Sequence, residues 1–109
     1  KEALEKVSAI LPEGCEIREV LSASPLSTPE NHPMVEMFKE VAEEVLDTSI
    51  GFKREHGGTD ARYFSEKGIP AFLYGPKGAG LHSKDEWVSV SSLQKHYKMY
   101  WGLFNKILA

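Results

Sequence analysis

Apolar side chains recur at the spacing of an α-helix in residues 33–47, and charged side chains occupy the opposite face. We therefore expect an amphipathic helix there, with Pro33 in its first turn and Asn31 or His32 as its cap. The broad apolar stripe of this predicted helix consists of Met34, Phe38, Val41 and Val45.

The two ends of the chain also carry helical patterns. Residues 1–11 have one apolar face and end before a Pro and a Gly, which is typical of an amphipathic helix. Near the other end, Ser91 is expected to cap a long final helix, with Gln94 three residues later completing a capping box. We expect its apolar side chains to cover a sheet, and they are Leu93, Tyr97, Tyr100, Trp101, Phe104 and Leu108.

Shorter apolar runs between these helices indicate strands. Residues 69–74 form such a run between two glycines, which suits a strand buried on both faces. Residues 61–67 can form about two helical turns before Gly68 ends them. Further extended segments are expected at 15–23, 49–55 and 88–90. The sequence therefore predicts an α/β fold.

Composition narrows the class of protein. The chain has 109 residues, 41% of them apolar, and a formal charge of −3 with its basic residues scattered, so neither a nucleic acid nor a membrane is expected as a partner. No stretch resembles a signal peptide or a membrane-spanning segment. A single cysteine, Cys15, cannot form an internal disulfide. We therefore expect a cytoplasmic protein.

Candidate chemistry gathers in residues 57–86. Gly57 and Gly58 run into Thr59 and a predicted helix start, an arrangement that favours an anion close to the backbone. The glycine-rich loop after the strand at 69–74 delivers His82 into the zone where ligands of α/β sheets gather. A phosphate-binding P-loop is excluded because Leu81 follows the last glycine of GPKGAG, where that motif needs a lysine.

These motifs carry a family resemblance. The order GGTDAR, GIPAFLYGP, LHSKDEWV and a closing helix is similar to the C-terminal part of the co-catalytic zinc deacylases and exopeptidases, a superfamily that includes succinyl-diaminopimelate desuccinylase, acetylornithine deacetylase, aminoacylase and carboxypeptidase G. The resemblance implies a fragment of a three-layer α/β/α catalytic domain, preceded by the last helix and strand of a ferredoxin-like lid domain. Residues 1–24 would end the lid, 25–32 would be a linker, and 33–109 would belong to the catalytic domain.

The resemblance also implies roles for particular residues. His82 looks like a ligand of one of two zinc ions, with cobalt or manganese as alternative metals. Gly58, Thr59 and Arg62 look like contacts for the carboxylate end of an N-acyl amino acid or small peptide substrate. We expect Asp85 or Glu86 to fix the His82 loop or orient its imidazole.

Other parts of such an enzyme have no match in this chain. It contains no His-x-Asp pair, and its adjacent glutamates Glu43 and Glu44 are expected to lie on an exposed helix face. The general base would then come from elsewhere. We therefore expect that this chain contains no catalytic residue and is inactive on its own. We expect an N-terminal part to complete the enzyme, and the lid to form a homodimer.

Two alternatives stay open at this point. The chain could be a non-catalytic assembly module in which His82 binds nothing, or part of a dipeptidase or tripeptidase of the same superfamily. The role of His56 is also open between substrate contact and plain surface residue. Thr59 and Asp60 are both good N-cap residues for the short helix, and Asp60 is expected to be a cap rather than a base.

Overall fold

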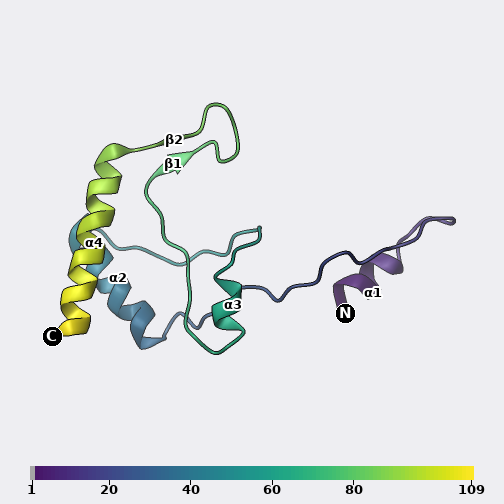
Figure 1. Cartoon of the computed structure of the whole chain (residues 1–109), viewed down its shortest axis with the longest axis horizontal. Helices are drawn as coiled ribbons and strands as arrows, with labels where there is room; N and C mark the ends of the chain where they lie inside the picture. The colour runs from purple at the N-terminus through teal and green to yellow at the C-terminus, as the bar shows by residue number, and fades with distance from the viewer. Residues whose placement is uncertain (1) are drawn as a thin grey trace.

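The computed structural model describes residues 2–109; Lys1, the first residue of the predicted N-terminal helix, lies outside the described residues. The four helices are α1 (Glu2–Ser8), α2 (Pro33–Leu46), α3 (Arg62–Ser65) and α4 (Val90–Leu108). Two short strands, β1 (Gly78–Ala79) and β2 (Trp87–Val88), form an antiparallel hairpin. Figure 1 shows α2 and α4 side by side, the hairpin beyond one end of α4, and α1 apart from both.

The core of the structure lies between α2 and α4. Phe38, Val41 and Ala42 of α2 pack with Met99 of α4, and all four are buried. Gly102 lets the two helices approach closely, because a Cβ atom built on it would lie 2.8 Å from Val41 Cγ1. Partly buried apolar side chains surround this cluster, namely Val45, Leu46, Ile50, Tyr74 and Leu103.

The ends of α2 are fixed by its own side chains. His32 is the N-cap, since its Nδ1 accepts a hydrogen bond from the Met34 amide at 3.2 Å, and Pro33 opens the helix as expected. After the helix, the Ile50 amide donates to the Glu43 carboxylate at 2.9 Å. Glu44 is exposed as predicted, whereas Glu43 is only partly exposed and holds the segment that follows the helix.

The start of α4 differs from the prediction. Ser89, not Ser91, is the N-cap, and its hydroxyl accepts from the Ser92 amide at 3.3 Å. The helix thus begins at Val90, which was expected to be extended. Ser92 Oγ also accepts from the Lys77 amide at 2.9 Å, so the start of α4 holds the strand segment that leads into the hairpin.

An exposed ion pair joins the far end of α4 to α2. Lys106 Nζ lies 3.2 Å from Glu40 Oε2 and 3.5 Å from Glu44 Oε1. The hydrogen bond to Glu40 holds the pKa of Lys106 above its ordinary value of 10.5. Because this pKa is raised, the pair's contribution to stability is fully present below pH 10.5 and is lost only as the pH rises through the raised value.

The strands predicted at 15–23, 49–55 and 69–74 are not formed in the described part of the chain. Residues 69–74 nevertheless pack as a strand would on one face, because Phe72 and Tyr74 both lie with their ring centroids 5.0 Å from that of Phe38. The physical reason for the missing strand is that a ladder needs a neighbouring strand, and residues 2–109 offer none at this position.

The segment predicted as a linker, residues 25–32, is anchored rather than free. Thr28 Oγ1 donates to the Ala71 carbonyl at 2.5 Å and accepts from the Ala71 amide at 3.0 Å. One side chain thus satisfies both backbone groups of Ala71, as a neighbouring strand residue would do. Residues 25–32 therefore lie beside residues 69–74 and help to hold them under α2.

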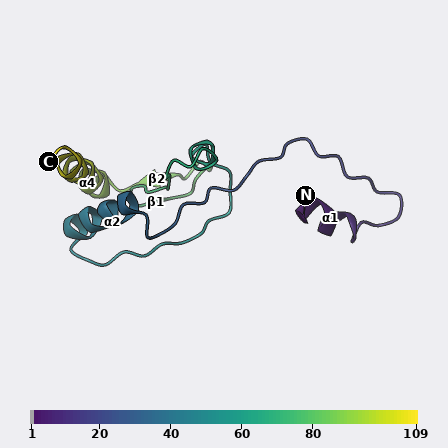
Figure 2. The same ribbon diagram turned by 90° about the horizontal axis from the view of Figure 1, so that it is seen from below.

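The structure leaves much apolar surface uncovered. Its accessible surface is 9418 Å², whereas a folded monomer of 12.2 kDa exposes about 6,100 Å². Its radius of gyration is 18.7 Å against about 13 Å for a compact domain of this length. In Figure 2 the chain extends away from the α2–α4 pair to an isolated α1, which buries no side chain.

The apolar stripe predicted for the final helix is largely exposed, so the expectation that it covers a sheet within this chain is wrong. Met99 and Gly102 face α2, while the opposite face of α4 points outward. We call this face the outer stripe of α4, and it consists of Tyr97, Trp101, Phe104 and Leu108, which are 53–83% exposed. A helix that is apolar on two faces is typical of a helix buried on both sides in a larger protein.

We predict that Gly102→Ala destabilises the protein by about 1 kcal/mol, because the added methyl group overlaps the buried and conformationally stiff Val41 and outweighs the gain in helix propensity. Thermal unfolding of the complete polypeptide measures the effect. Gly51→Ala, where a Cβ meets open space, is the control. The double variant Val41→Ala/Gly102→Ala should lose less stability than the sum of the losses in the two single variants. Strictly additive losses would contradict the overlap between the added methyl group and Val41.

Candidate functional site

The loop before α3 brings three of the predicted substrate-binding residues together. The Arg62 amide donates to the Thr59 carbonyl at 3.3 Å, and Thr59 Oγ1 accepts from the Ala61 amide at 3.3 Å. A Cβ atom on Gly58 would lie 3.4 Å from Arg62 Nη1, so the guanidinium rests against the Gly58 backbone. Gly58, Thr59 and Arg62 thus form one local cluster, which we call the Gly58 loop.

Capping of α3 differs from the prediction for Asp60. Thr59, rather than Asp60, supplies the side-chain oxygen that accepts a backbone N–H before the helix, and α3 spans only Arg62–Ser65. Gly68, with φ of 74°, ends the helical turns as predicted. Upstream, the Lys53 ammonium hydrogen-bonds the Glu55 carboxylate and lowers the pKa of Glu55, so a charged carboxylate precedes His56 at neutral pH.

Tyr63 is a neighbour of the Gly58 loop that the sequence analysis did not identify. Arg62 Nη2 donates to the Tyr63 hydroxyl at 3.0 Å, and Arg62 Cζ lies 4.7 Å from the centroid of the Tyr63 ring. Consecutive residues of a helix do not face each other, so spacing in the sequence gave no signal for this contact.

His82 lies on a different element, the seven-residue loop that joins β1 to β2. Its backbone is left-handed, with φ of 65°, and its side chain is exposed. Ser83 organises the loop, since its amide donates to the Gly80 carbonyl at 2.9 Å and its hydroxyl accepts from the Asp85 amide at 3.3 Å. The hairpin therefore projects the imidazole into solvent at a turn.

Glycines allow the hairpin to close. A Cβ atom on Gly78 would lie 2.5 Å from the Trp87 carbonyl oxygen, which is backbone and cannot move aside. Gly80 adopts φ of 76°, and a Cβ there would lie 3.0 Å from both the Asp85 carbonyl oxygen and Ser83 Oγ. Both positions need glycine, so the GPKGAG run serves to build the turn that presents His82.

The described residues can supply one ligand of a metal site but do not form a complete site. Within residues 2–109, no group of three or more His, Cys, Asp or Glu side chains is placed to hold a metal ion. Among the same residues, no hydrogen bond joins the His82 imidazole to Asp85 or Glu86. Zinc needs about three or four protein ligands, so His82 could contribute one of them and the others would have to come from outside this chain.

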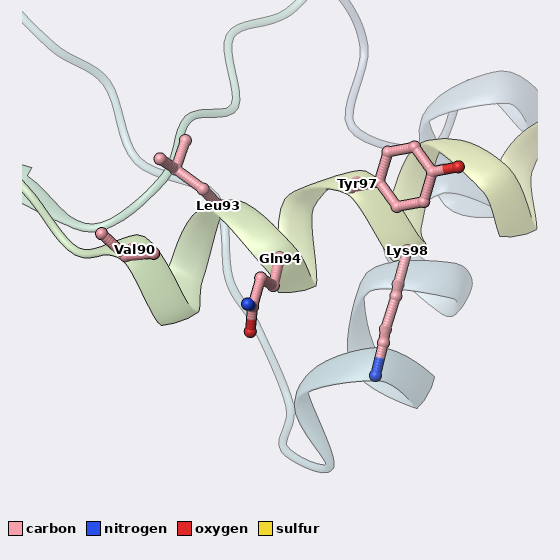
Figure 3. A pocket seen from close by; sticks show the side chains of 5 residues that line it. All are labelled: Val90, Leu93, Gln94, Tyr97 and Lys98. Carbon is pink, nitrogen blue, oxygen red and sulfur yellow. The ribbon is translucent and has the colours of Figure 1, made fainter.

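The structure does not bring the predicted metal ligand and the Gly58 loop side by side. In Figure 1, α3 and the β1–β2 hairpin lie at opposite ends of the extended run through residues 69–77. Two hollows on the described residues do not include His82 or the Gly58 loop. One, about 460 Å³, is an open groove on α4 alone, lined by Val90, Leu93, Gln94, Tyr97 and Lys98 (Figure 3).

The second hollow, about 210 Å³, lies between α4 and residues 74–77 and includes His96. The His96 ring stacks on Tyr74 with centroids 5.5 Å apart, and its Nδ1 is buried without a hydrogen-bond partner among the described residues. These ring contacts place His96 with the aromatic packing of the core.

Each helix within residues 2–109 is too short or too polar to cross a bilayer.

Comparison with known proteins places almost the whole chain in one family. The model of peptidase family M20/M25/M40 matches residues 3–106. A succinyl-diaminopimelate desuccinylase of Helicobacter pylori (strain G27) is 31% identical over 107 residues, which cover 98% of this chain and 27% of the relative. The desuccinylase of Xanthomonas oryzae pv. oryzae (strain PXO99A) is 35% identical over 91 residues, 80% of this chain and 23% of the relative.

A third desuccinylase, from Hydrogenovibrio crunogenus, is 29% identical over 80 residues, 73% of this chain and 21% of the relative. The chain therefore spans about a quarter of the length of the curated relatives that it matches. No solved structure matches the chain.

We predict that Gly78→Ala opens the β1–β2 hairpin, because its methyl group would collide with the Trp87 backbone. Amide hydrogen exchange in residues 77–89 should accelerate by about tenfold or more, as expected for an overpacking cost of roughly 1–3 kcal/mol. Gly75→Ala is the matched control, since a Cβ at Gly75 meets nothing within 4 Å. Equal exchange in the two variants would contradict the role of Gly78.

Proposed function

The chain belongs to peptidase family M20/M25/M40, and we propose that it forms part of a zinc-dependent amidohydrolase that cleaves the amide bond of an N-acyl amino acid or a small peptide. The observation that carries this proposal is the family match across residues 3–106, which includes both the Gly58 loop and the His82 hairpin. The names of the desuccinylase relatives make an N-succinyl amino acid such as succinyl-diaminopimelate the first substrate to test.

The Gly58 loop is the proposed binding point for the substrate's carboxylate. Gly58 lacks a side chain and exposes its backbone, and the Arg62 guanidinium lies against it. A guanidinium and free backbone N–H groups are the donors that proteins use for carboxylates. Thr59 keeps the loop in place through its hydrogen bond with the Ala61 amide.

His82 is the proposed ligand for one of two zinc ions in the complete enzyme. The exposed imidazole at the turn of the hairpin leaves a ring nitrogen accessible from outside the chain. Zinc, when bound, supplies Lewis-acid polarisation of the scissile carbonyl and lowers the pKa of a bound water. The remaining ligands and the general base belong to the part of the polypeptide outside these 109 residues.

That remaining part is also the proposed cover for the outer stripe of α4. The chain exposes roughly 3,000 Å² more surface than a folded monomer of its mass. An excess of this size is comparable to the interfaces of obligate partners. We propose further that α1 and the segment after it belong to a lid that can mediate a homodimer, since α1 buries nothing in this chain.

An assembly module without catalysis is the second candidate. The observation that favours it is the uncovered outer stripe of α4. In this alternative the chain buries α4 against a partner and His82 binds nothing. The metal content of the complete protein separates the two candidates.

We predict that His82→Ala in the complete protein lowers the zinc content below two ions per polypeptide and reduces hydrolysis of succinyl-diaminopimelate by more than a hundredfold, since losing a direct ligand should exceed the roughly 10–100-fold effect of losing a neighbour of a ligand. Elemental analysis and a steady-state assay measure the two effects. Lys84→Ala, on the same exposed loop, is the control. Unchanged zinc and activity in His82→Ala would support the assembly module instead.

We also predict that the purified 109-residue chain does not hydrolyse any N-acyl amino acid, because a single imidazole cannot retain the metal. Co-expression with the remaining polypeptide should restore hydrolysis. It should also slow hydrogen exchange at the backbone amides of α4 that flank the outer stripe. Turnover by the 109-residue chain alone, at a rate comparable to the complete protein, would show that the chain carries a whole site.

A further inference from the structure

The Arg62 guanidinium is held in one place by groups of this chain. On one side it lies against Gly58, where a Cβ would be 3.4 Å from Nη1. On the other side the Tyr63 hydroxyl accepts a hydrogen bond from Nη2 at 3.0 Å, and the Tyr63 ring lies beneath the cation at 4.7 Å. The guanidinium is thus confined between a glycine backbone and an aromatic ring.

This arrangement is not a by-product of helix geometry. Neighbouring residues of a helix point in different directions, so Arg62 must fold across to reach Tyr63. Ordering an arginine side chain costs conformational entropy. The cation–π contact and the hydrogen bond from the charged guanidinium both oppose that cost and favour the bent side chain.

The guanidinium still has an unused donor. Arg62 Nε is shielded from solvent and has no hydrogen-bond partner among residues 2–109. A buried donor on a charged group is unfavourable unless an acceptor reaches it, and a carboxylate is the acceptor that fits a guanidinium edge. The hydrogen bonds within residues 2–109 therefore leave one donor of this guanidinium unused.

We propose that Tyr63 is a positioning residue that fixes the Arg62 guanidinium against the Gly58 loop, so that Arg62 binds the amino-acid carboxylate of the substrate. This inference rests on the proposed function, which assigns the Gly58 loop to that carboxylate. It adds that the affinity for the carboxylate depends on a side chain that does not itself touch the substrate. The Tyr63 ring packs against the guanidinium, and the Tyr63 hydroxyl fixes the rotation of the guanidinium plane.

The test compares Tyr63→Phe, which keeps the ring and removes the hydroxyl, with Tyr63→Leu, which removes both, in the complete metal-loaded protein. With succinyl-diaminopimelate we expect KM to rise by about two- to tenfold in Tyr63→Phe, the equivalent of one hydrogen bond, and by more in Tyr63→Leu. The kcat should change little, because uniform binding is lost. Tyr97→Phe, which removes a hydroxyl from a tyrosine of α4 outside the Gly58 loop, is the matched control.

A double-mutant cycle distinguishes positioning from direct contact. If Tyr63 acts through Arg62, then Arg62→Lys/Tyr63→Phe should bind no worse than Arg62→Lys alone. For a substrate whose amino-acid carboxylate is replaced by a carboxamide, Tyr63→Phe and wild type should have similar KM values. Additive losses, or an undiminished effect with the carboxamide, would overturn the proposal.

Calorimetric binding of succinyl-diaminopimelate to the metal-free complete protein tests the same point without catalysis. Weaker binding by Tyr63→Phe in a protein that hydrolyses nothing would sustain the role of Tyr63 while removing the proposed function. Hydrolysis by wild type with unchanged KM and binding in Tyr63→Phe would overturn the role of Tyr63 alone. A wild-type protein that neither binds nor hydrolyses the compound would overturn both.

Discussion

The close contact between α2 and α4 is the constraint on which the rest of the structure depends. Four of the five buried apolar side chains belong to α2, and Met99 of α4 packs among three of them. Gly102 permits the approach, because any side chain there would meet Val41. Everything that carries candidate chemistry is positioned relative to this pair.

The hairpin and the Gly58 loop are attached to the helix pair in different ways. Ser89 and Ser92 tie the first turn of α4 to Lys77, so the direction of the hairpin follows that of the helix. Phe72 and Tyr74 press residues 69–74 against Phe38, and Thr28 satisfies the backbone of Ala71 from the other side. The Gly58 loop depends instead on local contacts around Arg62, and the segments on either side of it reach the core through Ile50 and through residues 69–74.

Membership of peptidase family M20/M25/M40 gives this incomplete burial a simple meaning. The curated relatives are about four times as long as the chain, and α4 is apolar on the face away from α2 as well as on the face toward it. A piece of a layered α/β protein is expected to contain extended segments without strand partners and helices with one uncovered face.

Local sequence chemistry predicted many of the elements. The stripe in residues 33–47 and the cap and proline before it correctly indicated α2, because these signals act within one or two helical turns. Gly68 correctly ended the turns of α3, and the glycines of GPKGAG marked the loop region that carries His82. The family resemblance also came from the sequence alone, because it lies in the order of short motifs rather than in contacts between them.

Tertiary structure decided the rest. Whether residues 69–74 become a strand depends on hydrogen-bond partners that no local pattern can supply. The N-cap of α4, Ser89, also donates its amide to the distant Lys77 carbonyl, a contact that the local pattern did not indicate. The bent conformation of Arg62 over Tyr63 joins two neighbours that ordinary helix spacing keeps apart. The sequence by itself therefore determined the helices, the turns and the family, while burial, strand pairing and the orientation of the charged side chain were decided by long-range contacts, because those energies depend on which distant surfaces meet.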